Sequence, residues 1–173
     1  MTHRVTATII LMTAMLMDLM DSTITNVALP AISTDLGATP TQLEWTLVGY
    51  VVAFATLLIT GGRLGDIYGR KRIFLVGVIG FTCASMLASL AWNGNALITA
   101  RIIQGAFAGV MVPQVLSSVQ VMYTPEERGP VFGVIGSLNA LGVITGLLLG
   151  GWLVTANLFG TGWRSIFLIN VPV

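Results

Sequence analysis

Residues 62–72 read Gly-Arg-Leu-Gly-Asp-Ile-Tyr-Gly-Arg-Lys-Arg, and this short stretch of glycines and charges separates two long apolar runs. It contains four of the eight Lys and Arg residues of a chain in which only 9% of residues are charged. Short basic loops between apolar runs are typical of the cytoplasmic side of proteins that cross a membrane several times. The stretch therefore predicts a tight cytoplasmic loop between two membrane-spanning helices.

The composition of the 173-residue chain favours the same class of protein. Hydrophobic residues make up 55% of the chain and the mean hydropathy is +0.89, well above the values of globular domains. The net charge of +1 provides no basic excess for binding nucleic acid. The single cysteine, Cys83, lies in an apolar run, where we expect a packed side chain. No residues have metal-site spacing and no nucleophile is paired with a base, so we expect no metal, no cofactor and no enzyme activity.

Five apolar runs are long enough to cross a bilayer, which takes roughly 20 residues of helix. We expect spans at about 6–29, 43–61, 73–91, 96–122 and 131–154, and a sixth that begins near Ile166. Pro30 is expected to end the first span. A signal peptide is the alternative for this first run, but the run is too long for one and contains Asp18 and Asp21. The sequence therefore predicts an all-α polytopic membrane protein.

The basic residues predict the orientation of the chain. Arg4, the 62–72 stretch and Arg128 fall on one side of the predicted membrane and hold six of the eight Lys and Arg residues. The opposite segments 30–42 and 92–95 hold none, and 155–165 holds only Arg164. Because basic residues concentrate in cytoplasmic loops, we expect a cytoplasmic N-terminus.

Three ionisable residues fall inside the predicted spans, where each charge costs about 2.5–3.5 kcal/mol to insert. Asp18 and Asp21 share one face of the first helix, and Arg101 lies near the start of the fourth span. Desolvation favours a neutral carboxylate and a nearby guanidinium favours a charged one, so a mobile Asp–Arg pair can bind and release a proton. Asp21 is a candidate site for a proton or a cationic substrate, or else a structural partner of Arg101. Arg101 could serve in coupling or in locking helices, and Asp18 could take part in coupling or face water.

Other residues carry weaker signals. Pro113 could kink the fourth span, and Gln114 could line a cavity or take part in helix contacts. Tyr50 could contact an aromatic or cationic substrate. Asp35, beside the second predicted span, is expected to be solvated.

Four motifs resemble those of the major facilitator superfamily, and more closely those of its fourteen-span drug:proton antiporter branch. The 62–72 stretch resembles the loop between the second and third helices. Residues 21–30, Asp-Ser-Thr-Ile-Thr-Asn-Val-Ala-Leu-Pro, resemble the first-helix signature. Residues 163–172, Trp-Arg-Ser-Ile-Phe-Leu-Ile-Asn-Val-Pro, resemble the element that opens the sixth helix. The fourth-helix motif is similar to the set formed by Leu97, Arg101, Gln104 and Gly105.

The resemblance implies a partial N-terminal six-helix half of that fold, with five spans plus the start of a sixth. It implies a proton-coupled secondary transporter of the cell membrane that exports small amphipathic or cationic drugs by alternating access. Asp21 and Arg101 would then couple protons, with Asp18 as a further candidate, and no substrate-binding residue is identified. The implied conformational latch consists of Gly62, Asp66, Gly69, Arg70 and Arg72. If the third helix begins near Asp66, its carboxylate lies at the positive helix end, four residues before Arg70.

Two residues depart from the family pattern, Leu147 and Ile67, and Ile67 stands where the family usually has a basic residue in the 62–72 stretch. Leu147 stands where the fifth helix of the family has a proline, so a backbone hydrogen bond is kept there. The chain also holds less than one half of such a transporter, and its end within a motif favours an incomplete sequence. The alternative is a truncated, non-transporting membrane fragment, or a subunit that needs a partner chain or a missing C-terminal half. Gly142, Gly146 and Gly150 recur every four residues and predict a face for close contact with such a partner.

Overall fold

The computed structural model describes residues 2–156 and 160–171, and within these ranges the chain forms helices and no strand. The elements are α1 (Thr2–Leu36), α2 (Pro40–Tyr68), α3 (Arg70–Ser89), α4 (Gly94–Met122), α5 (Pro125–Ala156), the 3₁₀ helix η2 (Gly162–Arg164) and α6 (Ser165–Leu168). Five of them, α1 to α5, are long and apolar enough to cross a membrane. The prediction of an all-α, multi-pass membrane protein is confirmed. The short α6 begins where the sixth span was expected, whereas Pro172 and Val173 lie outside the described residues.

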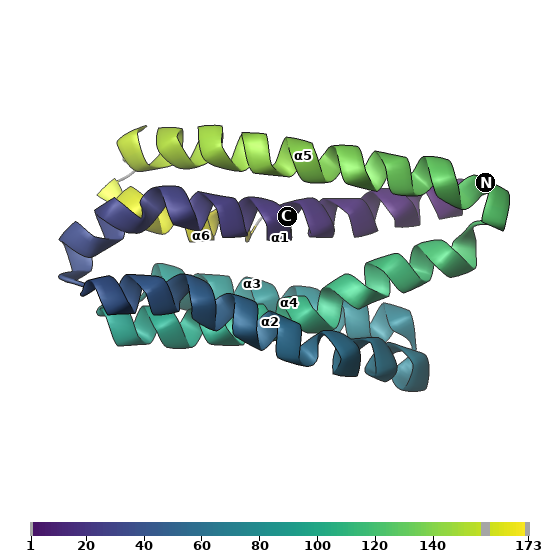
Figure 1. Ribbon diagram of the computed structural model, residues 1–173, viewed down its shortest axis with the longest axis horizontal. Helices are drawn as coiled ribbons and strands as arrows, with labels where there is room; N and C mark the ends of the chain where they lie inside the picture. The colour runs from purple at the N-terminus through teal and green to yellow at the C-terminus, as the bar shows by residue number, and fades with distance from the viewer. Residues whose placement is uncertain (1, 157–159, 172–173) are drawn as a thin grey trace.

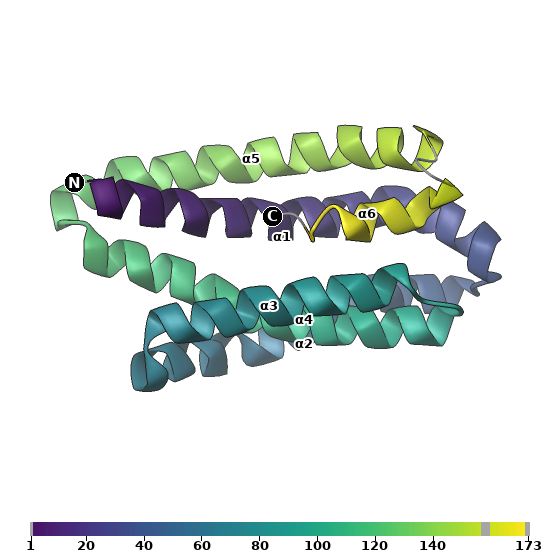
Figure 2. The same ribbon diagram turned by 180° about the vertical axis from the view of Figure 1, so that it is seen from behind.

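The long helices lie in two layers, as Figure 1 shows and Figure 2 repeats from behind. One layer contains α1 and α5, with η2 and α6 folded back against them. The other contains α2, α3 and α4, with α4 in contact with both of its neighbours. Contacts of α1 with α2 and α4, and of α3 with α6, join the two layers.

The expectation that Pro30 ends the first helix is wrong. Helix α1 continues through Pro30 to Leu36. Proline removes its own N–H donor and crowds the carbonyl four residues earlier, that of Asn26, and a membrane-spanning helix tolerates this where neighbouring groups satisfy the freed carbonyl. One turn further on, the hydroxyl of Thr34 donates a hydrogen bond to the Pro30 carbonyl at 3.0 Å.

The turn between α2 and α3 is shorter than the sequence indicates. Helix α2 runs on to Tyr68 and α3 begins at Arg70, so a single residue, Gly69, forms the connection with φ +94°. Because this φ lies in a region that L side chains rarely adopt, a glycine is required there. Asp66 therefore lies in the last turn of α2, and the expectation that it begins the third helix is wrong.

Glycines bring α2 and α4 into backbone contact. A Cβ atom added at Gly105 would lie 2.2 Å from the Tyr50 carbonyl oxygen, and one added at Gly109 would lie 2.5 Å from that of Phe54. Pro113 lies inside α4 and removes the N–H that would bond the Gly109 carbonyl. That carbonyl faces Gly61 of α2, whose added Cβ would lie 2.5 Å away. Helix α4 bends near its middle in Figure 1, as expected for a proline within a helix.

Glycines also line the contact between α5 and α1. Gly142, Gly146 and Gly150 are buried and lie against residues 16–27 of α1. A Cβ at Gly146, for example, would lie 2.9 Å from the Cβ of Thr23. The face that was expected to meet a partner chain is thus occupied by α1 of the same chain. Leu147, between two of these glycines, is exposed.

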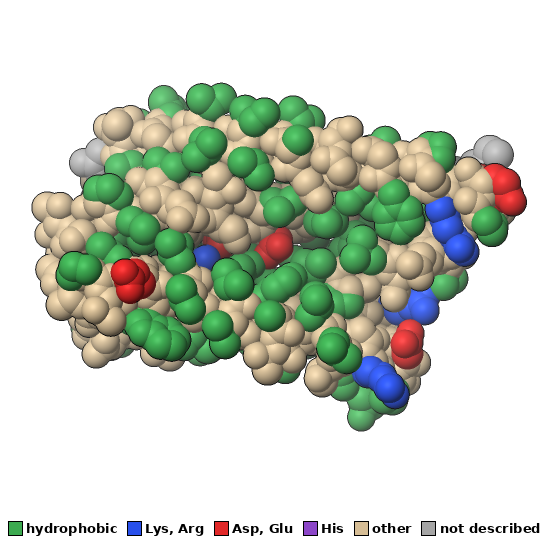
Figure 3. Space-filling view, viewed as in Figure 1, with side chains coloured by type: hydrophobic (Ala, Val, Ile, Leu, Met, Phe, Trp, Pro, Cys, Tyr) green, Lys and Arg blue, Asp and Glu red, His purple; other side chains and the backbone are tan. Residues whose placement is uncertain are grey.

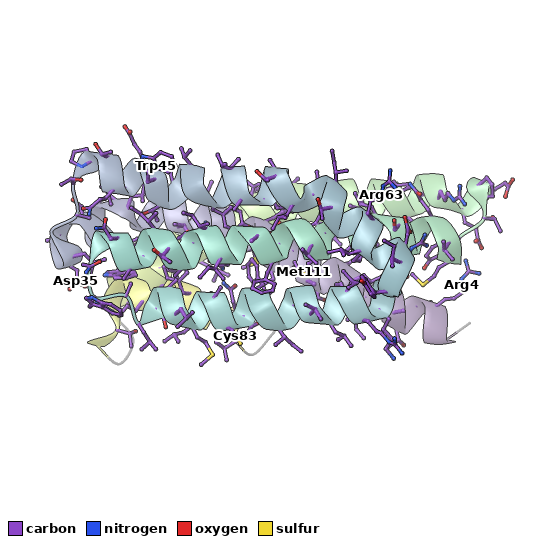
Figure 4. All side chains as sticks on the ribbon, turned by 90° about the horizontal axis from the view of Figure 1, so that it is seen from below. Arg4, Asp35, Trp45, Arg63, Cys83 and Met111 are labelled. Atoms are coloured by element: carbon purple, nitrogen blue, oxygen red, sulfur yellow. The ribbon has the colours of Figure 1, made fainter. Side chains whose placement is uncertain are left out.

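The charged residues separate toward the two ends of the helices. Figure 4 shows Arg4 and Arg63 at one end and Asp35 at the opposite end. Arg4 forms an ion pair with Glu127 of α5 at 2.8 Å and lies over the ring of Tyr123. Cys83 is exposed on α3, so the expectation of a packed cysteine is wrong. An apolar side chain is stable there because lipid, rather than water, surrounds a membrane-spanning helix.

Candidate functional site

A buried ion pair joins the two layers. Arg101 of α4 and Asp21 of α1 are each only 1% exposed, and the Arg101 Nη1 atom lies 2.5 Å from the Asp21 Oδ2 atom. Nη1 also donates to the Oε1 atom of Gln104, one turn along α4, at 2.7 Å. Figure 3 shows acidic and basic atoms in a furrow between the layers, surrounded by hydrophobic side chains. The structure thus brings together Asp21 and Arg101, two of the predicted coupling residues.

The second oxygen of Asp21 accepts two more hydrogen bonds. Its Oδ1 atom lies 2.9 Å from Gln104 Nε2 and 2.6 Å from Asn170 Nδ2. Asn170 donates its other hydrogen to the Ser85 hydroxyl of α3 at 2.8 Å. Ser85 in turn donates to the Phe167 carbonyl of α6 at 2.9 Å. Asp21 is therefore held by nitrogen donors from α4 and from the residue segment that follows α6.

Asp18 lies one turn before Asp21 and has a different partner. It is buried, and the hydroxyl of Tyr50 on α2 donates a hydrogen bond to its Oδ1 atom. The guanidinium carbon of Arg101 lies 4.2 Å from the centre of the Tyr50 ring, within the range of a cation–π contact. One side chain of α2 thus links Asp18 to Arg101.

We call this set the polar cluster, and it consists of Asp18, Asp21, Tyr50, Ser85, Arg101, Gln104 and Asn170. It holds two carboxylates and one guanidinium in a region of low dielectric, where an uncompensated charge is costly. Such a site can bind a proton or a small cation reversibly. Among the described residues there is also no group of three or more His, Cys, Asp or Glu side chains that could hold a metal ion.

The predicted latch residues lie apart from the polar cluster, at the basic end of the helices. Arg70 Nη2 lies 3.2 Å from Asp66 Oδ1, and Arg70 Nη1 donates to the Ser117 carbonyl of α4 at 3.1 Å. Gly69 forms the turn, Gly62 lies on α2 near Pro113, and Arg72 is exposed on α3. Arg70 therefore ties the α2–α3 turn to α4.

Gln114 is a further contact of this region that the sequence left open. It is buried and donates to the Gly61 carbonyl at 2.7 Å. Its Oε1 atom lies against Gly65, where an added Cβ would be 1.8 Å away. Of the two alternatives, the structure thus shows a contact between α4 and α2.

Sequence reasoning named Gln104 and Asn170 only as members of the fourth- and sixth-helix motifs, and it assigned neither of them, nor Ser85, a role in the site. Gln104 carried a usable signal, because it lies three residues after Arg101 and so on the same helix face. Asn170 is 149 residues from Asp21, and no local pattern indicates that the two side chains meet.

A second cluster holds the α6 segment in place at the opposite end. Asp35 accepts hydrogen bonds from Trp163 Nε1 at 2.9 Å and from Arg164 Nη1 at 2.5 Å. Arg164 also donates to the Ala91 carbonyl at 3.1 Å. Asp35 is exposed, as the sequence predicts, and its carboxylate also binds the segment that leads to Asn170.

Comparison with known proteins agrees with this architecture. The chain matches the model of the Major Facilitator Superfamily over residues 11–173. It is 49% identical over 164 residues to the probable actinorhodin transporter of Streptomyces coelicolor. This match covers 95% of this chain and 28% of that protein. It is 40% identical over 166 residues to the puromycin resistance protein pur8 of Streptomyces alboniger, covering 95% of this chain and 32% of the relative. It is 39% identical over 169 residues to the cephamycin export protein CmcT of Amycolatopsis lactamdurans, and this match covers 97% of this chain and 34% of the relative.

The chain thus spans about a third of the length of these relatives. The family and the relatives agree with the prediction of a transport protein rather than an enzyme. The family match extends over nearly all of a chain that folds into five long apolar helices and the start of a sixth. The chain therefore belongs to the Major Facilitator Superfamily.

Proposed function

We propose that the chain is the N-terminal part of a proton-coupled secondary transporter, an antiporter that exports small amphipathic or cationic molecules by alternating access. The observation that carries the proposal is the buried Asp21–Arg101 pair, which joins the two layers beside a second carboxylate. Ionisable groups at this depth are costly and are retained where they bind or move ions. The relatives named for transport, resistance and export support a small-molecule substrate.

Coupling between the ion and the movement follows from where the pair lies. The Asp21–Arg101 contact crosses from α1 to α4, so its strength contributes to how the two layers associate. A proton or cation bound in the polar cluster changes the charge balance of this contact. A ligand shifts a conformational equilibrium by as much as its affinities for the two states differ. The polar cluster is therefore where ion binding biases the arrangement of the helices.

We further propose that the α2–α3 turn acts as a conformational latch, formed by Gly62, Asp66, Gly69, Arg70 and Arg72. The bond from Arg70 to the Ser117 carbonyl supports this role, because it ties the turn to α4, the helix that carries Arg101. A movement of α4 that alters the polar cluster would also alter this contact.

The proposed setting is the cell membrane, with the basic end of the helices and the N-terminus in the cytoplasm. The lipid bilayer surrounds α1 to α5. Protons and the exported molecule are the proposed ligands, and a C-terminal half or partner chain completes the transport pathway.

The test is uncoupler-sensitive export of ethidium from cells. Cells would express the 173 residues alone or the entire reading frame of the source DNA, each with and without Asp21→Asn. We expect export by the longer protein, and its loss in Asp21→Asn when the two are compared at matched membrane expression, because the variant removes a charge from the layer-joining pair. Glu44→Gln, which changes an exposed carboxylate of α2 outside the polar cluster, serves as the comparison variant at matched expression. Export that Asp21→Asn leaves intact, with the same dependence on the proton gradient, would remove Asp21 from the mechanism.

A further inference from the structure

The polar cluster carries one net negative charge when Asp18, Asp21 and Arg101 are ionised and Tyr50 is neutral. The titratable and charged groups that face Asp18 are Tyr50 of α2, Asp21 on its own helix and Arg101 of α4. Arg101 forms its ion pair with Asp21, so the charge of Asp18 has no guanidinium of its own. An unpaired charge at this depth is costly, and a single proton removes the imbalance. The question is which of the two carboxylates receives it.

All the hydrogen-bond partners that the structure shows for the Asp21 carboxylate are donors. Both of its oxygens accept hydrogen bonds from nitrogen donors, namely Arg101 on Oδ2, and Gln104 and Asn170 on Oδ1. A guanidinium is only a donor, so it cannot accept a proton's hydrogen bond from a neutral Asp21.

The side-chain amides of Gln104 and Asn170 also cannot turn to accept a hydrogen bond from a neutral Asp21 without losing another bond. Gln104 accepts from Arg101 through its oxygen, so turning its amide would place the NH2 group against the guanidinium. Asn170 uses one nitrogen to bond both Asp21 and Ser85, so turning its amide would place its oxygen against both. Ser85 could then donate to that oxygen only by giving up the Phe167 carbonyl. Adding a proton to Asp21 would therefore break at least one of these bonds without a replacement.

The hydrogen-bond partner of Asp18 can act either as donor or as acceptor. Its bond comes from the hydroxyl of Tyr50, and a hydroxyl both donates and accepts. When Asp18 is ionised, Tyr50 donates to the carboxylate. When Asp18 takes up a proton, its new O–H group donates to the Tyr50 oxygen and the hydroxyl hydrogen rotates away. The pair therefore keeps its hydrogen bond in both protonation states.

We infer that Asp18, rather than Asp21, is the carboxylate that takes up the coupled proton, with Tyr50 as its hydrogen-bond partner and Asp21 as the permanent counter-ion of Arg101. This inference rests on the proton coupling proposed above. A proton bound at Asp18 affects the Asp21–Arg101 pair through Tyr50, because the Tyr50 side chain bonds Asp18 through its hydroxyl and its ring lies against the Arg101 guanidinium. Asp21 is then a positioning residue, which keeps Arg101 beside the site that titrates.

Carbon-13 NMR can observe each carboxyl group directly in the wild-type chain. The 173-residue chain would be labelled at its four aspartates, Asp18, Asp21, Asp35 and Asp66, and reconstituted in lipid vesicles. Asp18→Asn and Asp21→Asn serve only to assign signals, by the one that each removes. The wild-type signals are then followed from acidic to alkaline pH. Asp35 and Asp66, at the ends of the helices, provide the exposed reference signals.

We expect the Asp18 signal to move with pH between its acid and carboxylate positions while the Asp21 signal stays at its carboxylate position. A moving Asp21 signal, alone or together with Asp18, would overturn the inference, and so would two signals that both stay fixed. The NMR titration does not depend on whether the chain exports a substrate. A chain whose Asp18 titrates while the complete transporter needs no proton gradient would contradict only the proposed function.

Tyr50→Phe tests the hydrogen-bond partner. Removing the Tyr50 hydroxyl should shift the pH at which the Asp18 signal moves and leave the Asp21 signal at its carboxylate position. Tyr68→Phe is the matched control, because Tyr68 is an exposed tyrosine on the same helix. An equal shift in both variants, or none in Tyr50→Phe, would exclude Tyr50 as the partner of the titrating group.

Discussion

Arg101 shows how one side chain can link several helices at the scale of single residues. Its guanidinium contacts Asp21 of α1, Gln104 of α4 and the ring of Tyr50 on α2. A planar group with fixed donors suits this arrangement better than a lysine ammonium, which is compact and strongly hydrated. The cost of burying Arg101 is offset only while Asp21 remains its partner.

Replacing Arg101 alone should therefore destabilise the chain. We expect Arg101→Met to lower the free energy of unfolding by about 3–5 kcal/mol, because Asp21 is left as an unpaired buried charge. The double variant with Asp21→Leu should lose less than the sum of the two single changes, since it removes both charges together. Denaturant unfolding of the chain in detergent measures all three. Additive losses would contradict an interaction between the pair.

Asp66 should behave differently, because its ion pair with Arg70 is largely exposed to solvent. Exposed pairs contribute at most about 1 kcal/mol, so Asp66→Asn should leave expression and stability almost unchanged. A latch role predicts that ethidium export by the complete protein falls nevertheless. Loss of membrane expression in the same variant would instead indicate that Asp66 serves insertion or folding.

At the scale of elements, the glycines decide which helices approach closely. The α2–α4 contact depends on Gly105 and Gly109, whose missing side chains leave room for backbone carbonyls of α2. The α1–α5 contact depends in the same way on Gly142, Gly146 and Gly150. Within lipid, where apolar side chains gain little by leaving the solvent, such close approach is a main source of helix association.

Filling one of these contacts should be costly. In Gly105→Ala the new methyl group would lie 2.2 Å from the Tyr50 carbonyl oxygen, and a backbone atom cannot move aside cheaply. We expect a loss of about 1–3 kcal/mol in the free energy of unfolding. Gly136→Ala is the matched control, because nothing lies within 4 Å of its added Cβ, and its effect should stay within about 0.5 kcal/mol. Equal effects of the two variants would show that the α2–α4 contact does not depend on Gly105.

At the scale of the whole molecule, the distribution of charge sets how the chain lies in the membrane. Arg4, Arg63 and the basic start of α3 lie at one end, and the loop between α1 and α2 lies at the other. The cytoplasmic leaflet attracts such basic clusters. The helices should therefore be inserted with the basic end in the cytoplasm.

Cysteine labelling in intact cells checks this orientation. In a Cys83→Ala background, Lys71→Cys should react with a membrane-impermeant maleimide only after the cells are opened. Thr41→Cys, an exposed position at the start of α2, should react in intact cells. The reverse pattern would show that the chain is inserted the other way round.

The class of the protein, the five spans and the basic turn could be predicted from the sequence, because span length, hydropathy and charge are local properties of the chain. The sequence also identified Asp18, Asp21 and Arg101, since an ionisable residue within an apolar run is visible without any structure. The outcome at Pro30 shows the limit of such local rules, because the helix continues wherever its surroundings satisfy the backbone.

Which side chains meet became known from the folded structure. It brought Asn170 to Asp21, joined Asp35 to Arg164, and covered the α5 glycines with α1 rather than with a partner chain. It also placed nitrogen donors against Asp21 and a hydroxyl against Asp18, and the roles inferred for these two carboxylates rest on that difference. These contacts depend on the relative position and rotation of helices far apart in the chain, and no local pattern of residues specifies that arrangement.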